Sequence, residues 1–81
     1  MKVRVQFYAH LRDVVGVREL NVEFAEGATV GDLLEEIYVQ QPLLRAHDKS
    51  ILIGAGVEFV NRHYKLKPGE EISIMPPVQG G

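Results

Sequence analysis

The sequence predicts an α+β fold in which one main helix covers one face of a mixed β-sheet. Residues 2–8 and 19–24 alternate between apolar and polar side chains, which is the pattern of half-buried strands. Residues 30–37 carry an apolar stripe with the period of a helix, and residues 72–75 return to alternation. A chain of 81 residues is expected to form a single domain, residues 1–81, with a modest core.

The first two predicted strands are expected to form a hairpin. Charges of opposite sign lie between their apolar positions, with Lys2 and Arg4 on the first strand and Glu19 and Glu23 on the second. Antiparallel pairing would bring these charges together, although each surface ion pair contributes less than about 1 kcal/mol. We expect a longer loop, residues 9–16, to join the two strands.

The predicted helix has clear start and stop signals. Thr29 is an N-cap residue, and Asp32 follows it at the spacing of a capping box. Pro42 cannot continue the hydrogen-bonding pattern of a helix, so the helix is expected to end near residues 40–41.

The rest of the chain supplies the remaining strands. Residues 51–53 are predicted as a central strand, and residues 57–60 as a small edge strand after a turn at residues 54–56. This order of elements predicts the ubiquitin-like β-grasp arrangement. In that arrangement the first and last strands lie side by side and parallel in the middle of the sheet.

The same arrangement predicts a docking patch for a partner protein. It places Tyr8 and Met75 on the face away from the helix, near the end of the last strand. Together with Leu11 they are expected to form an exposed apolar patch. Isolated exposed apolar residues are also common, so scattered side chains are the alternative. Burial of all three within the domain would exclude the patch.

The segment after the last strand is expected to be an extended functional tail. It consists of Pro76, Pro77, Val78, Gln79, Gly80 and Gly81. Each proline lacks an N–H group and holds the preceding residue extended, whereas a glycine pair fits a channel too narrow for a Cβ atom. We expect a stiff exit and a thin end that presents the carboxylate of Gly81. The alternative is a frayed terminus.

Composition excludes several classes of function. The chain is 46% hydrophobic and 25% charged, as in ordinary globular domains, and its net charge of −2 argues against nucleic acid as a partner. It has no cysteine, so it has no disulfide, thiolate metal site or cysteine nucleophile. The start shows no apolar signal segment, and no stretch is apolar enough to span a membrane. We therefore expect a cytoplasmic protein without a membrane partner.

No side-chain active site is visible in the sequence. His10, His47 and His63 lack the spacing of metal ligands, so no metal site is predicted, and the serines lack a nucleophile motif. By elimination, the distinctive reactive group is the carboxylate of Gly81. A carboxylate is a poor acyl donor, so its use requires activation to a mixed anhydride by ATP bound to another protein.

Two stretches carry a resemblance to a known family. Residues 7–16, Phe-Tyr-Ala-His-Leu-Arg-Asp-Val-Val-Gly, are similar to a loop of two aromatic residues, Ala, x, Leu, Arg, an acidic residue, two further residues and Gly. Residues 76–81 match a Pro-Pro-Val-x-Gly-Gly ending. With the turn at residues 66–71, the chain resembles the small sulfur-carrier subunits of molybdopterin synthase, the MoaD family. The family usually has an Asn-Gly-type turn where this chain has residues 54–57.

The resemblance implies a non-catalytic carrier subunit of a sulfurtransferase complex, which binds no cofactor itself. An activating enzyme would adenylate Gly81 with ATP and magnesium, and a sulfur donor protein would supply the sulfur of a thiocarboxylate. The tail, threaded by residues 76–80, would then enter the large subunit of a heterotetramer and give sulfur to the pterin precursor of the molybdenum cofactor. The residues implied to contact partners are Phe7, Tyr8, Leu11, Arg12 and Met75.

Three other functions remain open at this point. Thiamine-pathway sulfur carriers share the fold, the ending and the activation, but lack the loop signature of Ala9, Leu11 and Arg12. A ubiquitin-like modifier would attach the activated Gly81 to lysines of many proteins. A plain interaction module would have an inert tail.

Overall fold

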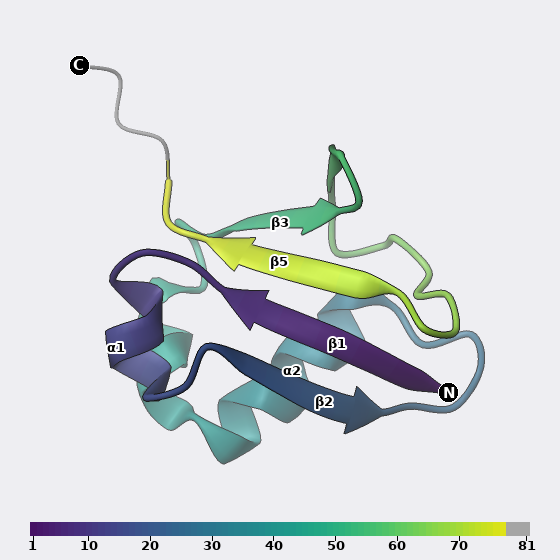
Figure 1. Ribbon diagram of the computed structural model, residues 1–81, viewed down its shortest axis with the longest axis horizontal. Helices are drawn as coiled ribbons and strands as arrows, with labels where there is room; N and C mark the ends of the chain where they lie inside the picture. The colour runs from purple at the N-terminus through teal and green to yellow at the C-terminus, as the bar shows by residue number, and fades with distance from the viewer. Residues whose placement is uncertain (78–81) are drawn as a thin grey trace.

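The structure, a computed structural model, describes residues 1–77 and builds one sheet with helices packed against it (Figure 1). Its elements in chain order are β1 (Lys2–Phe7), α1 (Leu11–Val15), β2 (Glu19–Glu23), α2 (Val30–Gln40), the 3-10 helix η1 (Pro42–His47), β3 (Leu52–Ala55), β4 (Glu58–Val60) and β5 (Glu71–Met75). The predicted hairpin, main helix and last strand are all present.

The sheet has the order β2-β1-β5-β3-β4. β1 is antiparallel to β2 but parallel to β5, and β3 is antiparallel to both β4 and β5. Figure 1 shows β1 and β5 side by side in the middle of the sheet, with α2 behind them. α2 and η1 carry the chain from β2, at one edge of the sheet, to β3 on the far side of β5, and the chain returns through β4 to β5 beside β1. The predicted β-grasp arrangement is therefore confirmed.

The core lies between the sheet and α2. The residues of α2 that form the predicted apolar stripe are all at most 1% exposed: Val30, Leu33, Leu34 and Ile37. The capping box that starts this helix is also present. The Thr29 side chain accepts a hydrogen bond from the Asp32 amide at 3.3 Å, and the Thr29 amide donates to Asp32 Oδ2 at 2.8 Å. Two of the orphan amides at the helix start are satisfied in this way.

The segment predicted as a loop between β1 and β2 contains a short helix instead. Leu11 and Val15 lie one turn apart in α1 and are buried against the core. Gly16 ends the helix with φ 81°, a left-handed conformation that glycine adopts readily, and its amide donates to Arg12 O at 2.8 Å. A helix of five residues is too short to produce a periodic pattern in the sequence.

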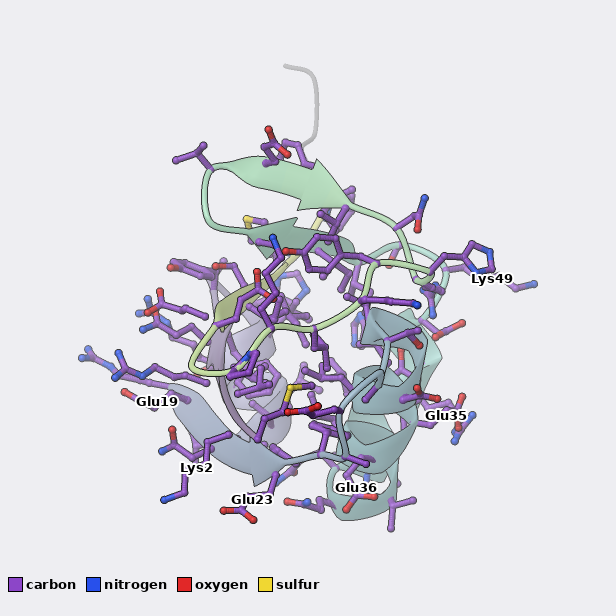
Figure 2. The ribbon with its side chains drawn as sticks, turned by 90° about the vertical axis from the view of Figure 1, so that its right-hand side faces the viewer. Lys2, Glu19, Glu23, Glu35, Glu36 and Lys49 are labelled. Atoms are coloured by element: carbon purple, nitrogen blue, oxygen red, sulfur yellow. The ribbon has the colours of Figure 1, made fainter. Side chains whose placement is uncertain are left out.

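Charged side chains lie on the outer surfaces of the domain. Figure 2 shows Lys2, Glu19 and Glu23 on the outside near β1 and β2. The register places Lys2 opposite Glu23, and Arg4 Nε lies 3.7 Å from Glu19 Oε2. The predicted complementarity of the first two strands is therefore present. The Arg4 and Glu19 side chains are about half exposed, so their pair contributes little to stability.

A polar cluster joins the end of α2 to the segment after η1 and to the connection between β4 and β5. The Tyr38 hydroxyl donates to Asp48 Oδ1 at 2.5 Å, and Arg62 Nη1 donates to the same oxygen at 2.7 Å. Burial, and the hydrogen bond to Asp48, raise the pKa of Tyr38 to about 12. The hydrogen bonds from Tyr38 and Arg62 hold the pKa of Asp48 below its ordinary value. The carboxylate of Asp48 is thus the shared acceptor of the cluster.

Asp48→Asn is expected to lower the free energy of unfolding by about 1 kcal/mol at neutral pH, because it removes a charged acceptor from two donors. The folded-state pKa of Asp48 is depressed, so its contribution is fully present above 3.8 and is lost as the pH falls through the lower folded-state pKa. The pKa of Tyr38 is raised, so its contribution is fully present below 10.0 and is lost as the pH rises toward about 12. Urea unfolding of both proteins across this pH range measures the difference.

The control for this experiment is Asp13→Asn, a change of the same kind on the exposed side of α1. The Asp48 variant should converge with the unmodified protein in acid, whereas Asp13→Asn should have little effect throughout. A stability difference for Asp48→Asn that stays constant from neutral to acid pH would contradict this account of the cluster.

Candidate functional site

The predicted tail begins directly after β5, which lies in the middle of the sheet (Figure 1). β5 ends at Met75, which pairs with Leu52 of β3, and on the other side the Tyr8 amide donates to Ile74 O at 3.1 Å. Pro76 is half-buried and Pro77 is exposed. The base of the tail is therefore held by hydrogen bonds on both sides of a central strand.

The predicted roles of the final residues are not tested by the structure. Val78, Gln79, Gly80 and Gly81 lie outside the described residues. The threading role of these residues and of the two prolines stays a prediction, and so does the activated carboxylate of Gly81.

Tyr8 and Met75 meet on the face of the sheet opposite α2. In β5, Ile72 and Ile74 are buried in the core, so the alternating positions Ser73 and Met75 point to the other face. A hollow of about 300 Å³ lies beside them. Its lining residues are Tyr8, Gly54, Gly56, Val57, Glu58, Phe59, Ser73 and Met75. The predicted proximity of Tyr8 and Met75 is confirmed.

The hairpin of β3 and β4 supplies the other half of this surface. Phe59 pairs with Gly54, which pairs in turn with Ser73 of β5. The Phe59 side chain is 68% exposed and that of Val57 is fully exposed. Gly54 has no side chain, which leaves the hollow open at this position. A Cβ atom there would lie only 3.2 Å from Met75 Cε. We call Tyr8, Gly54, Val57, Phe59 and Met75 the outer apolar face.

Sequence reasoning assigned Phe59 and Val57 to an edge strand but gave them no functional role. Alternation within a strand of three residues is too brief to show which side chains face outward. An aromatic residue in a short predicted edge strand was the available signal, since large apolar groups at such edges mark contact surfaces when they cluster.

Two of the predicted partner contacts are wrong. Leu11 is fully buried and Phe7 is 1% exposed, so neither presents a surface to another protein. Phe7 occupies an inward position of β1, and α1 turns Leu11 toward the core. The predicted docking patch therefore keeps Tyr8 and Met75 and loses Leu11.

The Arg12 side chain hydrogen-bonds to the backbone at the end of β1. Its Nε donates to Phe7 O at 3.0 Å, and its guanidinium carbon lies 5.8 Å from the centre of the Tyr8 ring. The side chain is therefore placed next to the outer apolar face by contacts within the domain. Its predicted contact with a partner stays a prediction.

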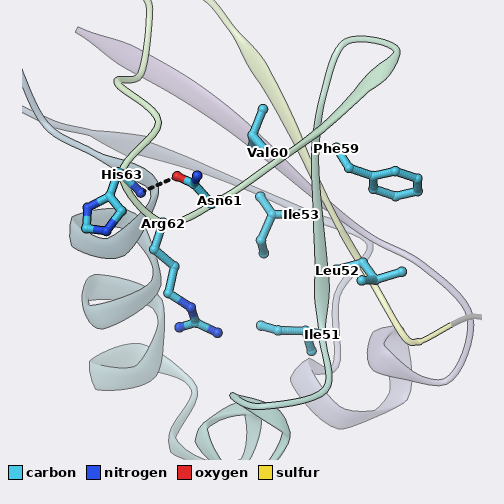
Figure 3. A pocket seen from close by; sticks show the side chains of 8 residues that line it. All are labelled: Ile51, Leu52, Ile53, Phe59, Val60, Asn61, Arg62 and His63. Atoms are coloured by element: carbon cyan, nitrogen blue, oxygen red, sulfur yellow. Dashed lines mark hydrogen bonds between the residues drawn. The ribbon is translucent and has the colours of Figure 1, made fainter.

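A second hollow, of about 360 Å³, lies at the edge of the sheet between β3, β4 and the turn that follows β4. Figure 3 shows Arg62 on one side of it and Ile51 and Ile53 on the other. Two of its polar groups have partners within the domain: the Arg62 side chain binds Asp48, and the His63 backbone amide donates to Asn61 Oδ1 at 2.8 Å. This hollow offers no evident chemistry.

Two further features of the described residues bear on function. Across residues 1–77, no three or more side chains of His, Cys, Asp or Glu gather closely enough to hold a metal ion. In the same range, every helix is too short or too polar to cross a bilayer. The candidate site described above consists of the tail exit and the outer apolar face.

Comparison with known proteins supports the predicted resemblance. The chain is 36% identical to the molybdopterin synthase sulfur carrier subunit of Chlamydomonas reinhardtii, with all of both chains covered. It superposes on the crystal structure of small archaeal modifier protein 1 from Haloferax volcanii with a TM-score of 0.86 at 26% identity, covering 95% of this chain and 98% of that one. A ubiquitin from Caldiarchaeum subterraneum, at a TM-score of 0.66 and 16% identity, covers 100% of this chain and 98% of its own and shares the fold alone.

These similarities extend over the whole domain. The predicted ubiquitin-like fold and the resemblance to molybdopterin synthase sulfur carrier subunits are both confirmed. The ThiS family matches residues 5–81, which include the central strands and the predicted tail. The chain therefore belongs to the ThiS family.

Proposed function

We propose that this chain is the sulfur carrier subunit of a molybdopterin synthase. The observation that carries the proposal is its full-length similarity to a protein of that name. The domain supports it physically, because the central strand β5 ends at the base of the predicted tail and anchors it on both sides.

The proposed chemistry takes place at Gly81, the last residue of the sequence. Its carboxylate attacks the α-phosphorus of ATP, held with magnesium by an activating enzyme, and pyrophosphate leaves. Sulfur at the oxidation level of hydrogen sulfide, delivered by a donor protein, then attacks the acyl carbon of the adenylate, so that AMP and a proton leave and a thiocarboxylate remains. Transfer of that sulfur to a pterin precursor in the large subunit, with water supplying the oxygen, restores the carboxylate.

The proposed docking surface for the large subunit is the outer apolar face. Met75 belongs both to this face and to the base of the tail, so a partner that receives the tail also meets the face. Aromatic residues and methionine are enriched in interface cores, and an apolar side chain of the partner would fill the hollow above Gly54. Docking and tail insertion would thus be parts of one contact.

A ubiquitin-like modifier is the second candidate, favoured by the structural similarity to small archaeal modifier protein 1. The same activated Gly81 would then be attacked by lysine amines of other proteins. The amine would displace AMP and form an isopeptide bond. The two functions require the same domain and differ in what receives the acyl group.

Intact-mass measurement after incubation with the activating enzyme, ATP and a sulfur donor tests the proposal. We expect the mass increase of one oxygen replaced by one sulfur, and a sample without ATP serves as the control. Free carboxylate in both samples would contradict a carrier role. Isopeptide adducts to many proteins in the native host, without a thiocarboxylate form, would favour the modifier.

A further inference from the structure

Two histidines that lie far apart in the sequence meet on the surface of the domain. The ring centroids of His10 and His47 are 5.8 Å apart, and their planes are tilted by 58°. His10 precedes α1 and His47 ends η1, two elements that pack against each other. Neither residue has a role in the proposed sulfur chemistry. We propose that this pair is a binding site for a late first-row divalent metal ion such as Zn²⁺.

The backbone at both histidines is held in place by hydrogen bonds within the domain. His10 O accepts hydrogen bonds from two amides of α1 at 3.0 and 3.2 Å, and the next residue, Leu11, is fully buried. His47 O accepts from two amides of the following turn at 2.9 and 3.1 Å, and Leu44 anchors η1 in the core. A ligand that bridges the two rings therefore orders only side chains, which lowers the entropy cost of binding.

The distance between the rings suits a shared ion. A metal bonded at about 2.1 Å to a ring nitrogen lies roughly 3.2 Å from the ring centroid, so two imidazoles at a tetrahedral angle have centroids about 5.2 Å apart. The observed separation of 5.8 Å is close to that value, and rotation about the side-chain torsions of the two histidines would bring one nitrogen of each ring to the ion. His10 is exposed and His47 half-buried, so water can fill the other coordination positions.

The chemistry of the site selects the ion. Imidazole nitrogens suit Zn²⁺, Cu²⁺ and Ni²⁺, whereas Mg²⁺ and Ca²⁺ require oxygen ligands. Asp48 follows His47, but its Oδ1 accepts from Tyr38 and Arg62, and within residues 1–77 no third His, Cys, Asp or Glu side chain lies close enough to complete a group of three ligands. A site with two protein ligands and water binds weakly and exchanges its ion readily. The bound ion would link α1 to η1 and stabilise the domain by mass action.

A Zn²⁺ titration of the full chain, followed by NMR of the histidine ring signals at about pH 7.5, tests this site because neutral imidazole is the metal ligand. The chain has three histidines, so His63 is an internal control. We expect the His10 and His47 signals to shift together along one saturation curve, and His63 to respond only at much higher Zn²⁺. The melting temperature should rise with Zn²⁺.

Single variants separate a shared site from independent histidines. His10→Ala and His47→Ala should each weaken Zn²⁺ binding at least about tenfold and remove the thermal shift, because the second ligand loses its partner. The matched control, His63→Ala, should behave as the unmodified protein. Equal shifts of all three histidines, or unchanged affinity in both single variants, would show only an aromatic contact and overturn the site. Neither result affects the sulfur-carrier proposal, which rests on Gly81 and the outer apolar face.

Discussion

Deletion of Gly81 is expected to abolish sulfur transfer while the domain stays folded and bound to the large subunit. The shortened chain still ends in a glycine carboxylate, but the maximum reach of that group from the domain is about 3.5 Å shorter. A displacement of about 1 Å at a reacting group already costs roughly 100-fold in rate, so a shift of one residue should bring transfer below detection. Single-turnover sulfur transfer, binding to the large subunit and the melting temperature are the three measurements.

Two companion variants separate the position of the carboxylate from other effects. One added alanine after Gly81 displaces the carboxylate outward by a similar distance and should also fail. Glu36→Gln changes an exposed residue of α2, on the opposite side of the sheet from the outer apolar face, and should transfer sulfur normally (Figure 2). Retained transfer by the chain that lacks Gly81 would remove the basis for placing the chemistry at that residue.

The sequence predicted the parts of the fold whose signals are long or chemically distinctive. β1, β2 and β5 alternate over five or six residues, and α2 carries both a buried stripe and the Thr29–Asp32 capping box. The parallel pairing of β1 with β5 followed from the order of elements. The strand and helix signals are local, so the residues that specify each element are close together in the chain.

The features of the fold and site that the sequence did not predict depend on contacts between residues far apart in the chain. Leu11 is buried because a short helix turns it inward, and the outward position of Phe59 depends on the register set after Gly56. The meeting of His10 and His47 requires α1 to pack against η1. The sequence therefore placed Tyr8, which directly follows β1, and Met75, which ends β5, but it did not indicate the contribution of the β3–β4 hairpin to the same surface.

The second large effect that we expect is on binding of the large subunit, and it concerns the β3–β4 hairpin. Phe59 is 68% exposed, so it adds little to the core, and its ring stands beside the hollow of the outer apolar face. An exposed aromatic residue next to a hollow is a typical interface anchor, and truncation of such anchors costs about 2 kcal/mol or more in binding. A charge at the same position would also have to be desolvated on docking, which adds to the cost.

Phe59→Asp is therefore expected to weaken binding of the large subunit at least about 100-fold, since each tenfold change corresponds to about 1.4 kcal/mol. Calorimetric titration with the purified large subunit measures the affinity, and thermal unfolding checks the fold. Leu43→Asp is the matched control, because Leu43 is 71% exposed and lies on η1, which contributes nothing to the outer apolar face. Equal losses in the two variants would indicate a general effect of added charge, and undiminished binding by Phe59→Asp would place the docking surface elsewhere.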